Sequence, residues 1–326
     1  MRFAVDGWDP GYGTSFGVDA AAESVSQVTT DVELAPSMWR PIGPGPVDQP
    51  QATVFVDGVR RLEARLWISA QGEGAEASMA LAASYAAGSV CCCDGSAHFL
   101  NAEVRRGLFA VAPQASDVET WAGTYRVFPT VLNESQGLAM SLSASLQHQL
   151  TTLEIATAVA ARALLAEHGI ADGRELLIVD GPVRGRDSLP RVLGFIKSHQ
   201  IAYLDAPLHA MVGTLAAGER TPVFLLAGNN WNRFTWYLRL PGPPSHPWAG
   251  IARVECAANL PASDAIALAD LSQVVLPRFA STEYKDSRAP QNLYPVGGLE
   301  RELRRRLGHP GLLYRALRLA AGQPAG

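Results

Sequence analysis

Two apolar stretches of the sequence end in an aspartate followed by a glycine. They are FVDG at residues 55–58 and IVDG at residues 178–181. If the two stretches are neighbouring strands, Asp57 and Asp180 project into one crevice. Close carboxylates repel each other, so such a pair is costly unless a cation, typically Mn²⁺ or Mg²⁺, lies between them. The alternative for each run is an ordinary Asp-Gly turn.

A third carboxylate is expected from the helical stretch between these two runs. Glu154 is the only acid of that stretch before Glu167, and it interrupts a face rich in Leu and Ala. Glutamate is rarely buried without a partner, so this position favours a metal ligand, with a solvent-facing residue as the alternative. Metal ions held by carboxylates activate water and neutralise a scissile phosphate, so the three acids predict metal-assisted hydrolysis of a phosphodiester.

Lys197 is a fourth candidate because lysine is scarce in this chain. Only two of the 27 basic residues are lysines. A lysine ammonium is compact and its pKa can move on burial, which a guanidinium does not offer. We therefore expect Lys197 to bind the scissile phosphate or to protonate the leaving oxygen, with a surface lysine on a helix as the alternative.

The stretches around these residues predict an α/β fold. A strand is expected to end at Asp57, a second to alternate from Leu62 to Ile68, and one or two more to flank a DGS turn at residues 94–96. A long helix follows, with a Ser-rich start and an end at Gly169. Residues 113–134 read as a loop-rich insertion.

The second half alternates strands and helices. Strands are expected at residues 175–181, 221–228, 234–240 and 250–258, and helices at 186–200, 263–279 and 298–308. Strands that pair locally, followed by this alternation, imply a ribonuclease H-like mixed central sheet flanked by helices. The expected organisation is an N-terminal arm (1–50), a ribonuclease H-like domain (51–310) and a C-terminal tail (311–326).

Composition limits the class of protein. With 48% hydrophobic and 18% charged residues the chain reads as soluble, without a membrane helix or a signal peptide, which favours the cytoplasm. Cys91, Cys92 and Cys93 are adjacent, and neighbours in a strand face opposite ways, so they cannot converge on one ion. From Arg278 to Arg318 the net charge is +5 against −9 for the rest, which fits a phosphate-binding segment or a solvated helix face.

Several of these motifs together resemble the NurA domain nucleases of bacterial type. The motifs are VFVDG, LTTLE, LLIVDGPVRG, GFIKSH, RVE and DSRAPQNLYPVGGLERELRRRLG, and the opening DGWDPGYGTSFG is similar too. The resemblance implies a ribonuclease H-like DNA nuclease, commonly manganese-dependent, with 5′ to 3′ exonuclease and single-strand endonuclease activity. It also implies a homodimer that acts with a HerA-type hexameric ATPase in DNA end resection and repair.

Carried over by motif, Asp57 and Asp180 match the strand aspartates and Glu154 the helix glutamate. Archaeal relatives have a histidine on the C-terminal helix, whereas this chain offers Glu300 and Glu302 there as possible metal ligands, and His309 only beyond a glycine. Acids beside arginines also form surface ion pairs, so both readings of these glutamates stay open.

Contacts to single-stranded DNA and duplex ends are expected from the same C-terminal region. The candidates are Arg301, Arg304, Arg305, Tyr294 and Asn292, with Arg306 angled away from the other arginines. Glu255 matches RVE but shares a strand face with Arg253 and can simply pair with it. Two alternatives to a metal-dependent nuclease of this family remain for the whole protein. One is a catalytically impaired DNA-binding or ATPase-docking subunit of the same fold, and the other is another ribonuclease H-like nuclease.

Overall fold

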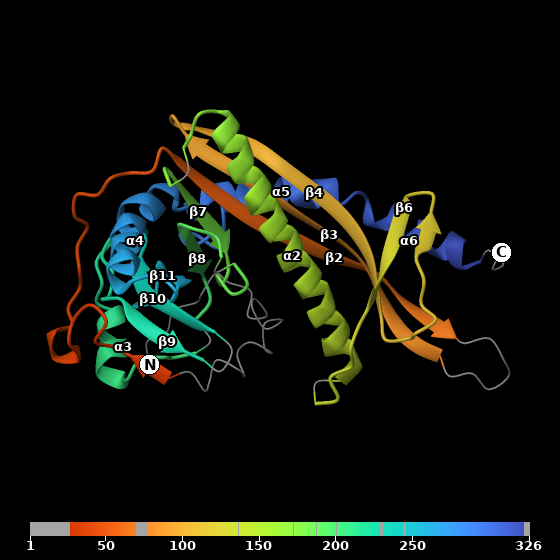
Figure 1. The fold of residues 1–326 in the computed structure, drawn as a ribbon, viewed down its shortest axis with the longest axis horizontal. Coiled ribbons are helices and arrows are strands. Elements are labelled where there is room, and N and C mark those ends of the chain that lie inside the picture. The colour runs from red at the N-terminus through yellow and green to blue at the C-terminus, as the bar shows by residue number, and fades with distance from the viewer. Residues whose placement is uncertain are drawn as a thin grey trace. The chain divides into compact units, whose positions relative to one another are not determined.

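The computed structural model describes residues 27–69, 77–135, 137–171, 173–186, 188–199, 201–228, 231–243 and 246–322. Their strands form one mixed sheet with helices beside it (Figure 1). The predicted α/β class with a mixed sheet is confirmed, and its ribonuclease H-like character stays a prediction. Most of the expected N-terminal arm, with the motif DGWDPGYGTSFG, lies outside the described residues.

The hydrogen-bonded order of the described strands is β1-β9-β10-β11-β8-β7-β2-β3-β4-β6-β5. The strands are β1 Gln27–Thr29, β2 Ala52–Ser69, β3 Ala77–Cys93, β4 Ser96–Ala110, β5 Val118–Thr120, β6 Gly123–Pro129, β7 Glu175–Asp180, β8 Val192–Ile196, β9 Phe224–Ala227, β10 Asn232–Arg239 and β11 Ile251–Ala257. The helices are α2 Gly137–Glu167, α3 Ala206–Val212, α4 Ala262–Val275, α5 Tyr294–Arg306 and α6 Pro310–Ala321, with short 3₁₀ helices η2 Pro36–Met38 and η3 Leu276–Phe279. Within this described part of the chain, no helix has both the length and the apolar character needed to cross a membrane.

The chain divides into two compact units. The first comprises the described residues up to Phe55 together with Cys91–His98 and Ala166–Gly297, and the second comprises Val56–Val90, Phe99–Leu165 and the described residues from Gly298 onward. Each unit has its own apolar core.

Strand β2 is longer than the sequence suggested. It runs for 18 residues without a break through Asp57 and Gly58, and its first six residues are all buried. The prediction of one strand ending at Asp57 and another beginning near Leu62 is therefore wrong. Glycine is typical of turns, but it also occurs within a strand where another group approaches the backbone closely, and Gly58 is such a glycine.

The turn between β3 and β4 is as predicted. Asp94 and Gly95 both have positive φ angles, 50° and 74°, in a two-residue connection. Two-residue hairpins favour this geometry because its twist matches that of the strands, and Asp-Gly is a preferred pair for it. Cys91, Cys92 and Cys93 lie at the end of β3, as expected for a strand, although only Cys91 is buried.

The expected loop at residues 113–134 contains two strands. Strand β6 pairs in parallel with β4, with Gly107 opposite Arg126, and pairs antiparallel with β5. Asp117 fixes this pairing by accepting hydrogen bonds from the Val127 amide at 2.8 Å and from Arg126 at 2.5 Å. The run GTYRVFP is rich in residues that favour strands, which explains why this segment is a strand and not a loop.

Helix α2 confirms the predicted long helix. Leu142, Leu146, Leu150 and Leu153 lie on one face of it and pack into the core of the second unit with residues of β3 and β4. In Figure 1 this helix crosses the strands β2, β3 and β4. Gly169, with a φ of 82°, follows its end as a left-handed residue should.

The predicted helix at residues 186–200 is wrong, because this segment contains strand β8. Val192–Ile196 pairs in parallel with β7 and antiparallel with β11. Residues 192–195 are all buried, which suits a strand covered on both faces. The periodicity of a short apolar run does not distinguish a helix from a strand, so the packing of this segment between β7 and β11 determines its structure.

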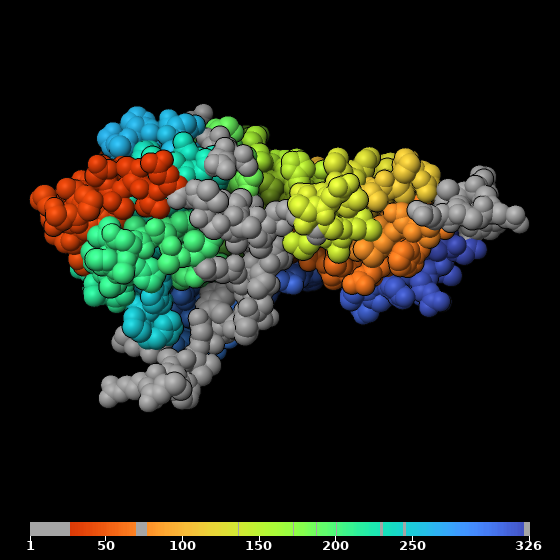
Figure 2. Space-filling model, turned by 90° about the horizontal axis from the view of Figure 1, so that it is seen from below, coloured from red at the N-terminus to blue at the C-terminus, as the bar shows by residue number. Residues whose placement is uncertain are grey.

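Arg220 joins several segments of the first unit. Its buried guanidinium contacts Glu33 at 2.7 and 2.8 Å, Asp270 at 2.5 Å and Gln273 at 3.0 Å. Burial lowers the pKa of Arg220, but the two carboxylates outweigh that effect and raise it above its usual value. The segment that follows β1 thereby stays against the body of the unit, where Figure 2 shows it beside α3.

We expect Arg220→Ala to lower the free energy of unfolding by about 3 kcal/mol, because it leaves Glu33 and Asp270 without their cation. The control is Arg126→Ala, which removes an ion pair with Asp117 on the surface and should cost about 0–1 kcal/mol. Urea midpoints measure both. Equal midpoints for the two variants would show that the Arg220 cluster is not a stabilising element.

Candidate active site

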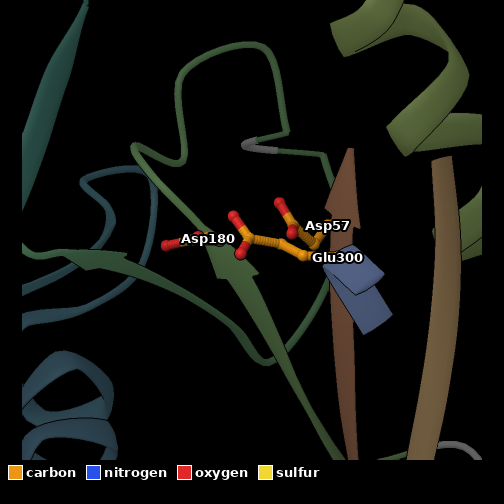
Figure 3. Close-up of side chains that lie close together, drawn as sticks. All are labelled: Asp57, Asp180 and Glu300. Carbon is orange, nitrogen blue, oxygen red and sulfur yellow. The ribbon is translucent and has the colours of Figure 1, made fainter. Parts of the chain in front are cut away.

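Three carboxylates gather at one place in the structure. Asp57 comes from β2, Asp180 from the end of β7 and Glu300 from α5, and one carboxylate oxygen of each lies within 4.8 Å of the other two (Figure 3). The set contains only hard oxygen donors, which suit Mg²⁺ or Mn²⁺ better than ions that prefer thiolates. These residues therefore fit a divalent cation.

Asp57 is held within a buried part of β2. One of its carboxylate oxygens accepts a hydrogen bond of 2.8 Å from the Gly58 amide. Strand β2 continues past Asp57 and Gly58 without a break, so these two residues do not form an Asp-Gly turn.

Asp180 and Lys197 are brought together by the parallel pairing of β7 and β8. In the register Asp180 lies opposite Phe195, two residues before Lys197. The Lys197 ammonium lies 2.6 Å from Asp180 Oδ2, and the lysine side chain is 1% exposed. Lys197 is therefore not a surface lysine on a helix.

The same ammonium is connected to a second acid. Lys197 donates a hydrogen bond of 2.9 Å to Asn292 Oδ1, and Asn292 Nδ2 donates one of 2.6 Å to Asp286 Oδ2. Burial raises the pKa of Asp286, but hydrogen bonds from Asn292 and from the Arg288 backbone hold it below its usual value. Asn292 was expected to contact a nucleotide, yet it is 0% exposed and both ends of its amide are used within the protein.

Glu300 is positioned by the close packing of α5 on β3. Gly88 has no side chain, and a Cβ placed there would lie 2.9 Å from Leu303 and 3.2 Å from Leu299. Both leucines are buried, so this face of α5 is directed toward β3. The missing side chain lets the helix approach the strand, and Glu300 follows Leu299 directly.

Glu302 has different surroundings, although it is only two residues away. It accepts hydrogen bonds of 2.9 and 2.8 Å from Arg305 and of 2.7 Å from Arg306. These two arginines lower the pKa of Glu302 to about 2. This is the surface ion pairing that the sequence left open for the acids of this helix, and it separates Glu302 from Glu300.

Glu154 is buried on α2 and lies against the residue that follows Asp57. A Cβ added to Gly58 would lie 2.4 Å from Glu154 Oε1 and 2.7 Å from Leu150 Cδ1. The alternative of a solvent-facing Glu154 is therefore excluded. Its role as a metal ligand stays a prediction, because the group of three carboxylates contains Glu300 instead.

Gly58→Ala tests this contact. We expect it to displace the Glu154 carboxylate and to lower the free energy of unfolding by about 1–3 kcal/mol, as overpacking does. Gly43→Ala is the control, since nothing lies within 4 Å of a Cβ there. Urea unfolding of both variants is the measurement, and unchanged stability of Gly58→Ala would mean that Glu154 does not contact residue 58.

Glu255 is fully buried and supports the loop that follows Asp180. It accepts a hydrogen bond of 2.8 Å from the Val183 amide and forms ion pairs with Arg253 at 2.8 Å and Arg233 at 3.3 Å. The pairing of Glu255 with Arg253, which was the alternative to a role of Glu255 in the RVE motif, is present in the structure. Sequence reasoning missed Arg233, which lies opposite Ala257 across the β10–β11 pair and has no motif of its own.

The remaining candidates lie on the surface. Tyr294, Arg301 and Arg304 are exposed, whereas Arg305 and Arg306 pair with Glu302 and Arg306 also lies over the Phe99 ring. His309 is exposed just before α6 and is not part of the carboxylate group. The proposed DNA contacts of these arginines and of Tyr294 stay predictions.

Comparison with known proteins adds a structural likeness. No family model matches the chain, and no curated protein matches it. The chain is similar to the NurA nuclease from Sulfolobus solfataricus, with a TM-score of 0.44 and 11% sequence identity over 97% of each chain.

Proposed function

We propose that this protein is a divalent-metal-dependent nuclease that hydrolyses phosphodiester bonds of DNA. The observation that supports this proposal is the gathering of Asp57, Asp180 and Glu300 beside a buried lysine. Carboxylates placed this close are unfavourable unless cations share the site. A group of oxygen donors with an ammonium next to it is suited to a substrate that carries negative charge.

Asp57, Asp180 and Glu300 would hold the cation, and Glu154 is a further candidate from the contact beside Gly58. A bound Mn²⁺ or Mg²⁺ would supply a water of lowered pKa and neutralise charge on the phosphate. Lys197 can direct its ammonium to a phosphate oxygen or give a proton to the leaving oxygen. Asn292 and Asp180 orient that ammonium.

A more detailed proposal for the activity and the partners follows from the resemblance of the motifs to the NurA domain nucleases. It comprises 5′ to 3′ exonuclease and single-strand endonuclease activity, a preference for manganese, homodimer formation and action with a HerA-type ATPase in DNA end resection and repair. Arg301 and Arg304, exposed on α5, together with Tyr294 would contact the DNA backbone and bases.

One observation favours an alternative. Lys197 already neutralises part of the charge on Asp180 at 2.6 Å, as a site that has lost its metal would require. The alternative is a catalytically impaired subunit that binds DNA or docks on an ATPase. Metal binding and cleavage assays separate the two proposals.

Glu300 and Glu302 provide a matched pair for this test. We expect Glu300→Gln and Asp57→Asn to lower metal-dependent cleavage of end-labelled single-stranded DNA at least 100-fold, because each removes one charge that a cation needs. Glu302→Gln has the same chemistry two residues away and should retain cleavage. Isothermal titration with Mn²⁺ should show weaker binding for Glu300→Gln and Asp57→Asn, and unchanged binding for Glu302→Gln.

Equal loss of activity in Glu300→Gln and Glu302→Gln would remove the carboxylate group from the mechanism. If the unmodified protein binds DNA but neither binds Mn²⁺ nor cleaves, the impaired-subunit alternative holds.

The arginines of α5 make a separate prediction about salt. If Arg301 and Arg304 contact phosphates, replacing both with glutamine should reduce the slope of log affinity against log salt by about 1.4 on single strands, roughly 0.7 for each contact. Arg315 and Arg318, exposed on α6, give a control with the same loss of charge. Affinity at several salt concentrations and the oligomeric mass are measured together. An unchanged slope with an altered mass would make α5 an assembly surface.

A further inference from the structure

A lysine between two tyrosine rings lies on the segment that leads into α5. The Lys285 ammonium is 5.4 Å from the centre of the Tyr284 ring and 5.2 Å from that of Tyr294. Tyr284 is 81% exposed and Tyr294 is 41% exposed. The Tyr284 ring therefore contributes little to the core, and most of its surface is open to a partner.

Hydrogen bonds hold this group in place. The Tyr294 hydroxyl shares a hydrogen bond of 2.8 Å with Thr282 Oγ1, and the Thr282 carbonyl accepts from the amides of Lys285 at 2.9 Å and Asp286 at 3.1 Å. Thr282 and Lys285 thus belong to one hydrogen-bonded turn that is fixed against Tyr294, the first residue of α5.

The turn is also joined to the candidate active site. Asp286 follows Lys285 directly and accepts a hydrogen bond from Asn292, and Asn292 accepts one from Lys197. Lys197 in turn contacts Asp180. A ligand bound at the tyrosines is therefore placed at a fixed position relative to the carboxylate of Asp180.

The chemistry of the group selects a nucleotide with an unpaired base. Aromatic rings stack on base faces, and an ammonium together with the start of a helix attracts a phosphate. In a duplex the base faces are covered by neighbouring pairs, so only a single strand or a frayed end can use the ring faces. A cation between rings is also less suited to a purely apolar protein partner.

We propose that Tyr284, Lys285 and Tyr294 form a stacking subsite for one unpaired base of single-stranded DNA, next to the site of cleavage. This inference rests on the proposed nuclease function and specifies its substrate. The base stacks on the Tyr284 ring, and Lys285 contacts the adjoining phosphate.

Binding of single-stranded DNA to the full chain tests the subsite. All proteins carry Asp57→Asn so that the probe, a fluorescein-labelled oligothymidylate, stays intact. Tyr284→Ala should weaken binding about 5- to 150-fold, the range for one base–aromatic stack, while Tyr284→Phe keeps the affinity. Tyr314→Ala, which removes another exposed tyrosine, from α6, should leave it unchanged.

A second measurement locates the stacked base. Oligonucleotides with one abasic position moved stepwise along the strand should bind the Asp57→Asn protein less well at one position, and Tyr284→Ala should abolish that difference. Lys285→Ala should reduce the salt slope by about 0.7. Because Tyr284 is largely exposed, its variants should unfold at the urea midpoint of the parent.

Two outcomes overturn the inference. One is equal affinity of Tyr284→Ala and its parent for the single strand, and the other is an abasic effect that Tyr284→Ala does not change. The proposed nuclease function fails by a different result, namely no metal-dependent cleavage by the unmodified chain. A chain that cleaves but ignores Tyr284 would refute the subsite alone.

Discussion

Three carboxylates with oxygens within 4.8 Å of one another repel strongly unless positive charge lies among them. Lys197 supplies part of that charge through its contact of 2.6 Å with Asp180, and its burial keeps solvent ions from screening the pair. The elements that carry these groups must therefore hold them firmly, since a looser arrangement would let the acids separate. Parallel pairing of β7 with β8 does this for Asp180 and Lys197, and helix packing does it for Glu300.

Glycines allow the close approaches on which the site depends. Gly58 leaves room for the Glu154 carboxylate, and Gly88 for the leucines of α5. At Gly194 a Cβ would lie 2.8 Å from the Gly181 carbonyl and 2.9 Å from Glu255, so β8 also needs a bare backbone. The two Asp-Gly pairs differ in this respect. Gly181 has a positive φ of 107° and forms an isolated bridge with Phe195, whereas Gly58 stays within a strand and admits a helix side chain.

The arginines of the chain fall into two groups with different physical roles. Arg220, Arg233 and Arg253 are buried against carboxylates, where removing one partner leaves a charge in a medium that solvates it poorly. The exposed arginines of α5 are balanced only in part, because Glu302 pairs with Arg305 and Arg306. Arg301 and Arg304 remain toward solvent, which is where a phosphate-binding surface would need them.

The sequence by itself determined the elements with a long or strong pattern, such as α2, β7 and β9 to β11, and it indicated Asp57 and Asp180 as partners from their equivalent motifs. Tertiary structure decided the rest. It continued β2 through Gly58, made residues 192–196 a strand, and buried Asn292 under Lys197. It also distinguished Glu300 from Glu302. Residues two apart on a helix point about 200° apart, so only the surface on which α5 packs determines which acid meets Asp57 and Asp180.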